Sequence, residues 1–140
     1  NIAGTVVGVT LAHLVVSLVY SVWITTATFK SVPAILEDAA VNLGCTRLKA
    51  FFTITLPLAI PGLIASAIFV FLNSLDEFTG TFFVGSPYVR TLPVLMYTAS
   101  MGYNMQAASV IAVMLTIPSL VFMAVLEKFL KAEYIHGLGV

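Results

Sequence analysis

Three long runs of apolar residues dominate the pattern of hydrophobic and polar positions along the chain. They extend from Gly4 to Phe29, from Ile54 to Asn73 and from Ala107 to Leu126, and the last two contain no charged residue. About 20 residues of α-helix cross the hydrocarbon core of a bilayer, because each residue adds about 1.5 Å. The runs lack the alternation of a barrel strand. The pattern therefore predicts an all-α transmembrane helical bundle with three membrane spans.

The connector between the first two runs, residues 30–53, has the pattern of two short helices. Ser31 and Pro33 are a start signal, and Gly44 is a stop signal. Apolar or small residues recur between them at helical spacing, at Leu36, Ala39, Ala40 and Leu43. Thr46 is placed to cap a second helix, which would carry Leu48, Phe51 and Phe52 on one face. We expect a helix hairpin with an apolar face that fits a groove in a partner.

The connection between the second and third runs, residues 74–106, is too long for a bare loop in a compact protein. Thr91 and Pro93 favour a helix start, and Gly102 favours its end. A short helix between Thr91 and Gly102 is therefore expected here.

Composition supports a membrane protein and excludes several other classes. Hydrophobic residues make up 60% of the 140 residues, charged residues only 9%, and the mean hydropathy is +1.08. A soluble domain of this size is usually more charged. A net charge of zero argues against a nucleic-acid partner. The single Cys45, without a Cys/His cluster at ligand spacing, excludes an internal disulfide and a structural zinc site.

The basic residues predict how the chain is oriented. Five of the six Lys and Arg residues follow the first run or the third, at Lys30, Arg47, Lys49, Lys128 and Lys131, and only Arg90 lies on the other side. Positive residues are retained on the cytoplasmic side. Residues 30–53 and the C-terminus are therefore expected to be cytoplasmic, with the connection 74–106 outside. Three spans are an odd number, so we also expect a missing N-terminal half.

The hairpin carries a family resemblance. Asp38-Ala39-Ala40, then Gly44, then Ile54-Thr55-Leu56-Pro57 resembles the EAA signature of ABC importer permeases. Asp38 departs from the family pattern, which most often has Glu, and Glu37 precedes it. The resemblance implies a coupling helix pair that docks on a cytoplasmic ATPase, with the coupling residues Asp38, Ala39, Ala40, Gly44, Ile54, Leu56 and Pro57. The alternative is an amphipathic hairpin lying on the membrane surface.

The resemblance also implies how the protein is assembled. Residues 1–140 would be the C-terminal part of a single transmembrane permease domain in the bacterial plasma membrane. Its partners would be a cytoplasmic ABC ATPase dimer, a second permease subunit, an extracytoplasmic solute-binding protein and membrane lipid. The chain has no G-x-x-x-x-G-K-[ST] motif, so we expect no cofactor and no enzymatic activity here, with ATP bound by the partner ATPase.

Residues 73–78, 81–85 and 91–93 resemble the spermidine/putrescine-type permeases, which implies a polyamine or a similar small solute. Candidate pathway residues are the polar side chains within or beside the spans: His13, Ser17, Asn73, Asp76 and Glu77. A cation would find carboxylates here and aromatic faces from Phe69, Phe78, Phe82 or Tyr103.

Each of these features has an alternative. Asp76 and Glu77 are equally consistent with solvated positions at the membrane boundary or a salt bridge to Arg90. His13 is typical of an interhelical hydrogen bond, and His13 with Ser17 lacks the orienting acid of an intramembrane hydrolase. For the whole chain, the alternatives are an ion-coupled carrier or channel subunit and a structural or assembly membrane protein.

Overall fold

Every regular element in the part of the chain that the structure describes is a helix. The computed structural model describes residues 2–137, with side chains described to Val125 and at Glu127. The elements are α1 (Val6–Ser31), α2 (Ala34–Asn42), α3 (Arg47–Ala50), η1 (Phe51–Thr55), α4 (Leu56–Leu75), η2 (Thr81–Gly85), α5 (Leu92–Met101) and α6 (Met105–Gly137). Both η elements are π-helical turns.

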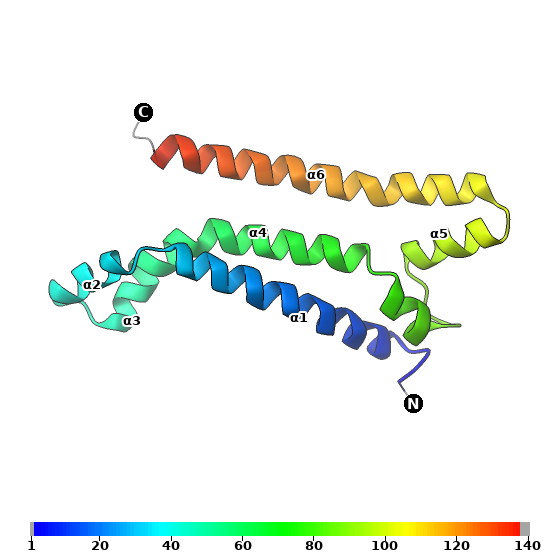
Figure 1. Ribbon diagram of the computed structural model, residues 1–140, viewed down its shortest axis with the longest axis horizontal. Helices are drawn as coiled ribbons and strands as arrows, with labels where there is room; N and C mark the ends of the chain where they lie inside the picture. Colours follow the sequence, from blue (N-terminus) through cyan, green and yellow to red (C-terminus); the bar gives the residue numbers. More distant parts are fainter. Residues whose placement is uncertain (1, 138–140) are drawn as a thin grey trace.

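Three of these segments are long and apolar enough to cross a membrane, which confirms the predicted fold class. They are Val6–Ser31, Arg47–Leu75 and Met105–Val125. In Figure 1 α1 and α4 lie side by side, and α6 runs back along α4. The hairpin formed by α2 and α3 occupies one end of the molecule, and η2 and α5 occupy the other. We call these the hairpin end and the η2 end.

The boundaries differ from the prediction at the hairpin. Residues 47–53 do not form a separate short helix, because α3 and η1 continue directly into α4. Ser31 does not start α2. It ends α1, and its Oγ donates a hydrogen bond of 2.7 Å to the carbonyl oxygen of Thr28. The third helix also extends to Gly137, beyond the predicted Leu126. Lys128 and Lys131, used for the predicted orientation, lie outside the described side chains.

The predicted helix in the second connection is confirmed, with one difference in how it ends. It spans Leu92–Met101 and is capped by Gly102, whose φ is −81°. The residue with a left-handed backbone is the next one, Tyr103, at φ 58°. The chain therefore reverses between α5 and α6 at Tyr103.

A glycine on α4 allows α1 and α4 to approach closely. A Cβ added at Gly62 would overlap Thr28 Cγ2 and lie 2.6 Å from Thr28 Oγ1. Small residues permit this spacing in lipid, where packing replaces the hydrophobic effect as the driving force. Gly62 therefore sets the distance between the first two spans.

Most large apolar side chains face outward, and the buried core is small. Among the described side chains, its hydrophobic members are Val9, Ala50, Ala59, Val94, Ala108 and Leu115. Trp23, in the middle of α1, is 76% exposed. Outward apolar surface is what a bilayer requires of spanning helices, whose backbone groups are already paired within each helix. The exposed surface therefore agrees with lipid or other membrane helices as the surroundings of this chain.

Candidate functional site

The turn of the hairpin depends on a residue with left-handed backbone. Gly44 has φ +94°, and no atom lies within 4 Å of a Cβ built on it. A side chain there would meet no steric obstacle, but L-residues adopt this conformation at a cost of about 1–2 kcal/mol. After the turn, Thr46 caps α3 by accepting a hydrogen bond of 3.3 Å from the backbone N–H of Lys49. Both predicted signals are confirmed.

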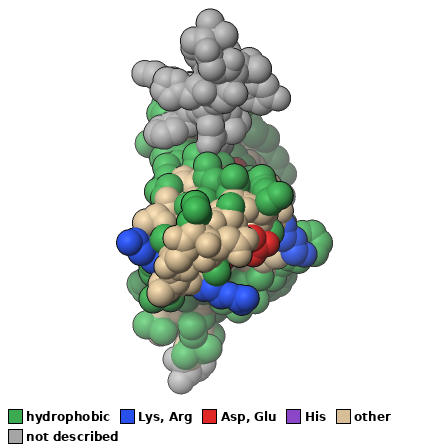
Figure 2. Space-filling model, turned by 90° about the vertical axis from the view of Figure 1, so that its left-hand side faces the viewer, with side chains coloured by type: hydrophobic (Ala, Val, Ile, Leu, Met, Phe, Trp, Pro, Cys, Tyr) green, Lys and Arg blue, Asp and Glu red, His purple; other side chains and the backbone are tan. Residues whose placement is uncertain are grey.

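The hairpin exposes apolar side chains at its tip and along both of its helices. Exposure reaches 89% at Leu43, 73% at Ile35 and 72% at Leu48, and Phe52 is 57% exposed. Lys and Arg side chains also gather at this end (Figure 2), where α1 and α3 contribute Lys30, Arg47 and Lys49. This end thus presents apolar side chains together with basic ones and the exposed carboxylate of Asp38, and a protein partner could cover such a surface.

The structure divides the seven predicted coupling residues into two groups. Asp38, Ala39 and Gly44 are exposed on the hairpin, and Ala40 is half-buried. Ile54, Leu56 and Pro57 lie where η1 passes into α4. The side chain that joins the groups is one that the prediction did not select. Glu37 Oε2 accepts a hydrogen bond of 2.8 Å from Thr55 Oγ1.

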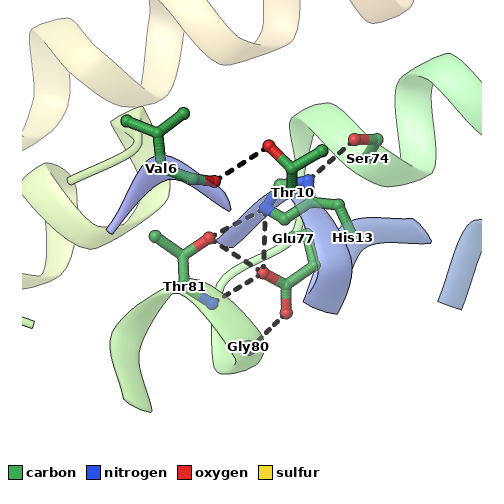
Figure 3. Close-up of polar contacts among 7 residues, drawn as sticks. All are labelled: Val6, Thr10, His13, Ser74, Glu77, Gly80 and Thr81. Carbon is green, nitrogen blue, oxygen red and sulfur yellow. Dashed lines mark hydrogen bonds and ion pairs between the residues drawn. The ribbon is translucent and has the colours of Figure 1, made fainter. Parts of the chain in front are cut away.

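A cluster of polar side chains connects α1, α4 and η2 at the other end of the molecule (Figure 3). His13 of α1 lies between them, with Nδ1 2.8 Å from Ser74 Oγ and Nε2 2.8 Å from Thr81 Oγ1. His13 Nε2 is also 3.3 Å from Glu77 Oε2. Thr81 Oγ1 donates to Glu77 Oε2 at 3.1 Å, so it accepts from Nε2–H when that nitrogen carries the proton. We name His13, Ser74, Glu77 and Thr81 the His13 cluster.

Glu77 has a local role in this cluster, just beyond the end of α4. Its carboxylate accepts hydrogen bonds from the backbone N–H groups of Gly80 and Thr81, at the start of the helical turn that includes η2. An anion at a helix N-terminus satisfies N–H groups that have no partner within the helix. Burial raises the pKa of Glu77, but these hydrogen bonds and His13 outweigh burial and hold the pKa below its ordinary value.

Asp76 faces a different region from Glu77, so the two carboxylates are not a pair. It lines an open hollow of about 360 Å³ between α4, α5 and α6, together with Phe78, Pro93, Met96, Tyr97, Ser100 and Leu115. The Phe78 and Tyr97 rings are 5.2 Å apart. Phe82 stacks on Phe78, also at 5.2 Å. The hollow thus combines one carboxylate with aromatic faces.

Two predicted features of this region differ from the structure. In this part of the described chain Glu77 lies 3.3 Å from His13 Nε2, and no ion pair joins Arg90 to Asp76 or Glu77. Phe69 packs instead on Tyr20, with ring centroids 5.5 Å apart, and Tyr103 is 91% exposed. The aromatic partner that the prediction missed is Tyr97.

Comparison with known proteins places this architecture in a family. Residues 2–132 match the family described as binding-protein-dependent transport system inner membrane component. The chain belongs to this family. The three spans, the hairpin and the short helix of the second connection are those of an inner membrane transport component.

Several curated relatives resemble this inner membrane component. A putative ABC transporter permease protein, ORF1 of Streptomyces antibioticus, is 32% identical over 93% of this chain and 58% of its own length. The putrescine transport system permease protein PotI of Escherichia coli K12 is 36% identical over 67% of this chain and 34% of its own length. The molybdenum transport system permease protein ModB of the same strain is 43% identical over 65% of this chain and 41% of its own length. The chain thus spans between about a third and three fifths of these relatives.

The five predicted pathway residues of this inner membrane component are distributed over three surroundings. His13 and Glu77 meet in the His13 cluster, and Asp76 lines the hollow. Ser17 and Asn73 are half-buried on α1 and α4. Sequence reasoning missed Ser74 and Thr81, which hold His13. The available signal was a Glu followed three and four residues later by Gly80 and Thr81, which is the spacing of a carboxylate that caps a helix start.

Proposed function

We propose that this chain belongs to the permease subunit of an ATP-binding-cassette importer, where it lines a solute pathway and couples it to cytoplasmic ATPase subunits. In this proposal the hairpin end is cytoplasmic and the ATPase dimer binds there. A second permease subunit completes the pathway, and an extracytoplasmic solute-binding protein delivers solute at the η2 end. ATP is bound by the ATPase partner.

The observation that carries the proposal is the way the hairpin joins the second span. Its apolar side chains, including Leu43 and Leu48, are exposed, so the hairpin presents a surface that a partner can bury. Its second helix continues through η1 into α4 without a loop. A partner that binds the hairpin is therefore connected to a membrane helix through continuous helical backbone. A ligand shifts a conformational equilibrium only through different contacts in the two states, and in this proposal the ATPase makes those contacts on the hairpin surface.

The test is whether the hairpin captures an ATPase subunit. Leu43→Asp and Leu48→Asp, introduced into the full-length permease, should abolish copurification of the ATPase and ATP-dependent uptake into proteoliposomes. The control is Tyr103→Asn at the η2 end, because Tyr103 is as exposed and Asn tolerates its left-handed backbone. This control should still capture the ATPase.

Three results would contradict the proposal. If both hairpin variants still captured the ATPase, the hairpin would not be the site at which the ATPase binds. Conduction without nucleotide would favour a channel or an ion-coupled carrier. Binding of membrane partners without solute movement would favour a structural or assembly protein.

For the solute, we propose a polyamine such as putrescine or spermidine, or a similar small cation. The Asp76 hollow supports this, because a carboxylate attracts an ammonium group and aromatic faces stabilise it. The similarity to a putrescine permease supports it too. Similarity to a molybdenum permease at 43% identity means that sequence similarity alone does not select the solute.

Uptake of putrescine, spermidine and molybdate by the reconstituted transporter tests this assignment. Asp76→Asn removes the charge and keeps the side-chain size, so it should raise the KM for the polyamines. Uptake that is unchanged in Asp76→Asn, or wild-type uptake of molybdate alone, would contradict a polyamine pathway through the hollow.

A further inference from the structure

The polar contact between Glu37 and Thr55 spans the junction between the hairpin and the membrane. Thr55 is buried, at 8% exposure, and its hydroxyl donates to the Glu37 carboxylate at 2.8 Å. Hydrogen bonds to an ionised group are shorter and about twice as strong as neutral ones. Among the described side chains, this is the one side chain to side chain hydrogen bond that α2 makes with another element.

The contact sits at a local change in helix geometry. In η1 the backbone N–H of Leu56 bonds to the carbonyl oxygen of Phe51, one residue further back than in an α-helix. Pro57 explains the widening, because it has no N–H and its ring clashes with the carbonyl four residues earlier. A π-helical turn inside a longer helix is a common feature of functional sites. The covalent path from the hairpin to α4 thus passes through a turn with irregular hydrogen bonding.

Glu37 provides a second connection between the hairpin and α4, which does not run through the backbone of η1. It lies on α2, on the far side of the Gly44 turn from α3, yet it bonds to Thr55, the last residue of η1. The stacked rings of Phe29 and Phe51, 5.9 Å apart, join the end of α1 to the same junction. The hairpin is therefore attached to α4 at two points, one through the chain and one through this hydrogen bond.

We propose that Glu37 and Thr55 form a latch that makes α2 and α4 move together, so that displacement of the hairpin is transmitted to the second span and not absorbed in η1. The latch rests on the proposed function, because it needs a partner that moves the hairpin. Glu37 and Thr55 are positioning residues, which act through the helix and touch neither solute nor ATP.

Neighbouring residues of the same chemistry do not meet this description. Thr53, also in η1, donates its hydroxyl to the carbonyl oxygen of Lys49 at 2.7 Å, within its own helix. Asp38, beside Glu37, is exposed. Thr53→Val is therefore a matched control for Thr55→Val, since each variant removes one hydroxyl and keeps the shape of the side chain.

The test measures uptake and ATP hydrolysis together, with the full-length permease assembled with its ATPase and binding protein in proteoliposomes. Thr55→Val should retain ATPase capture and ATP hydrolysis but move about tenfold less solute per ATP, because loss of a hydrogen bond to a charged group lowers the fraction of complexes with α2 joined to α4 by about that factor. Thr55→Ser should restore the ratio, Glu37→Gln should be intermediate, and Thr53→Val should match wild type.

Hydrogen exchange in the same complex gives a second measurement. Thr55→Val should speed amide exchange in α2, and Thr53→Val should not. A wild-type ratio of uptake to hydrolysis in Thr55→Val, or equal loss in Thr53→Val, would overturn the latch and leave the proposed function intact. A wild-type complex without ATP-dependent uptake would overturn both.

Discussion

The two ends of the molecule differ in whether their side chains find partners within the chain. At the η2 end, side chains of α1, α4 and η2 and the Glu77 carboxylate between α4 and η2 satisfy one another in the His13 cluster (Figure 3). At the hairpin end, the Glu37–Thr55 hydrogen bond joins α2 to η1, but large apolar side chains remain exposed. A buried polar group without a hydrogen-bond partner destabilises the fold. Exposed apolar side chains stabilise a structure only when another surface covers them. The η2 end is therefore held by the chain itself, and the hairpin end is shaped for a partner.

The comparison predicts different consequences for mutations at the two ends. Changes in the His13 cluster should reduce the stability of the protein alone. Changes in the hairpin should leave the isolated protein largely intact and impair what it does with a partner.

The largest effect is expected from Gly44→Val, which should bring ATP-driven uptake to background at an unchanged expression level. A β-branched residue cannot adopt φ +94° without strain, so the turn and the angle between α2 and α3 must change. Gly44→Asn is the control, because Asn tolerates left-handed backbone and should retain much of the uptake. Normal uptake by Gly44→Val in proteoliposomes would show that the angle of the hairpin is unimportant.

At the η2 end, His13→Leu should lower the free energy of unfolding by about 3 kcal/mol, because it leaves Glu77 without its ion-pair partner and Ser74 and Thr81 each short of a hydrogen bond. Thermal unfolding of the detergent-solubilised protein measures this loss. Thr10→Val is the control, since Thr10 Oγ1 donates to Val6 in its own helix. Equal stability of the two variants would mean that the His13 cluster does not hold the η2 end.

Between the ends, Gly62→Ala should destabilise the protein by about 2 kcal/mol through overpacking. Alanine favours helix more than glycine does, so a loss here has to come from the contact with Thr28. Thr28→Ala should rescue part of the loss in the double variant. Gly102→Ala, where a new Cβ would lie 3.4 Å from the nearest atom, should have little effect. A rise in melting temperature for Gly62→Ala would rule out tight packing of α1 on α4.

The smallest effect concerns pH. The pKa of Glu77 in the folded protein lies below its ordinary value of 4.5, so its stabilisation is fully present above that pH and is lost as the pH falls through the folded pKa. Melting temperature should therefore decline below about pH 4.5, and Glu77→Gln should flatten part of this decline. Asp38→Asn, at an exposed site, is the control, and its melting temperature should depend on pH as that of the wild type does. An identical slope in Glu77→Gln and wild type would contradict the assignment.

Features that depend on local chemistry could be predicted from the order of the residues. Apolar run length predicts the three long helices, because a bilayer requires about 20 apolar helical residues. Gly44 and Thr46 predict the turn and the cap, and Thr91 to Gly102 predicts the helix α5, because such signals act within a few residues. The motif from Asp38 to Pro57 indicated the family to which the chain belongs.

The pairing of polar groups, in contrast, depends on how the helices pack. Glu37 rather than Asp38 faces Thr55, and Asp76 and Glu77, adjacent in sequence, turn toward different helices. These choices depend on how helices rotate against each other, and a rotation of one residue, about 100° in an α-helix, changes which side chain points inward. Run length and spacing do not fix that rotation. It is set by contacts such as Gly62 with Thr28, which join residues far apart in the chain.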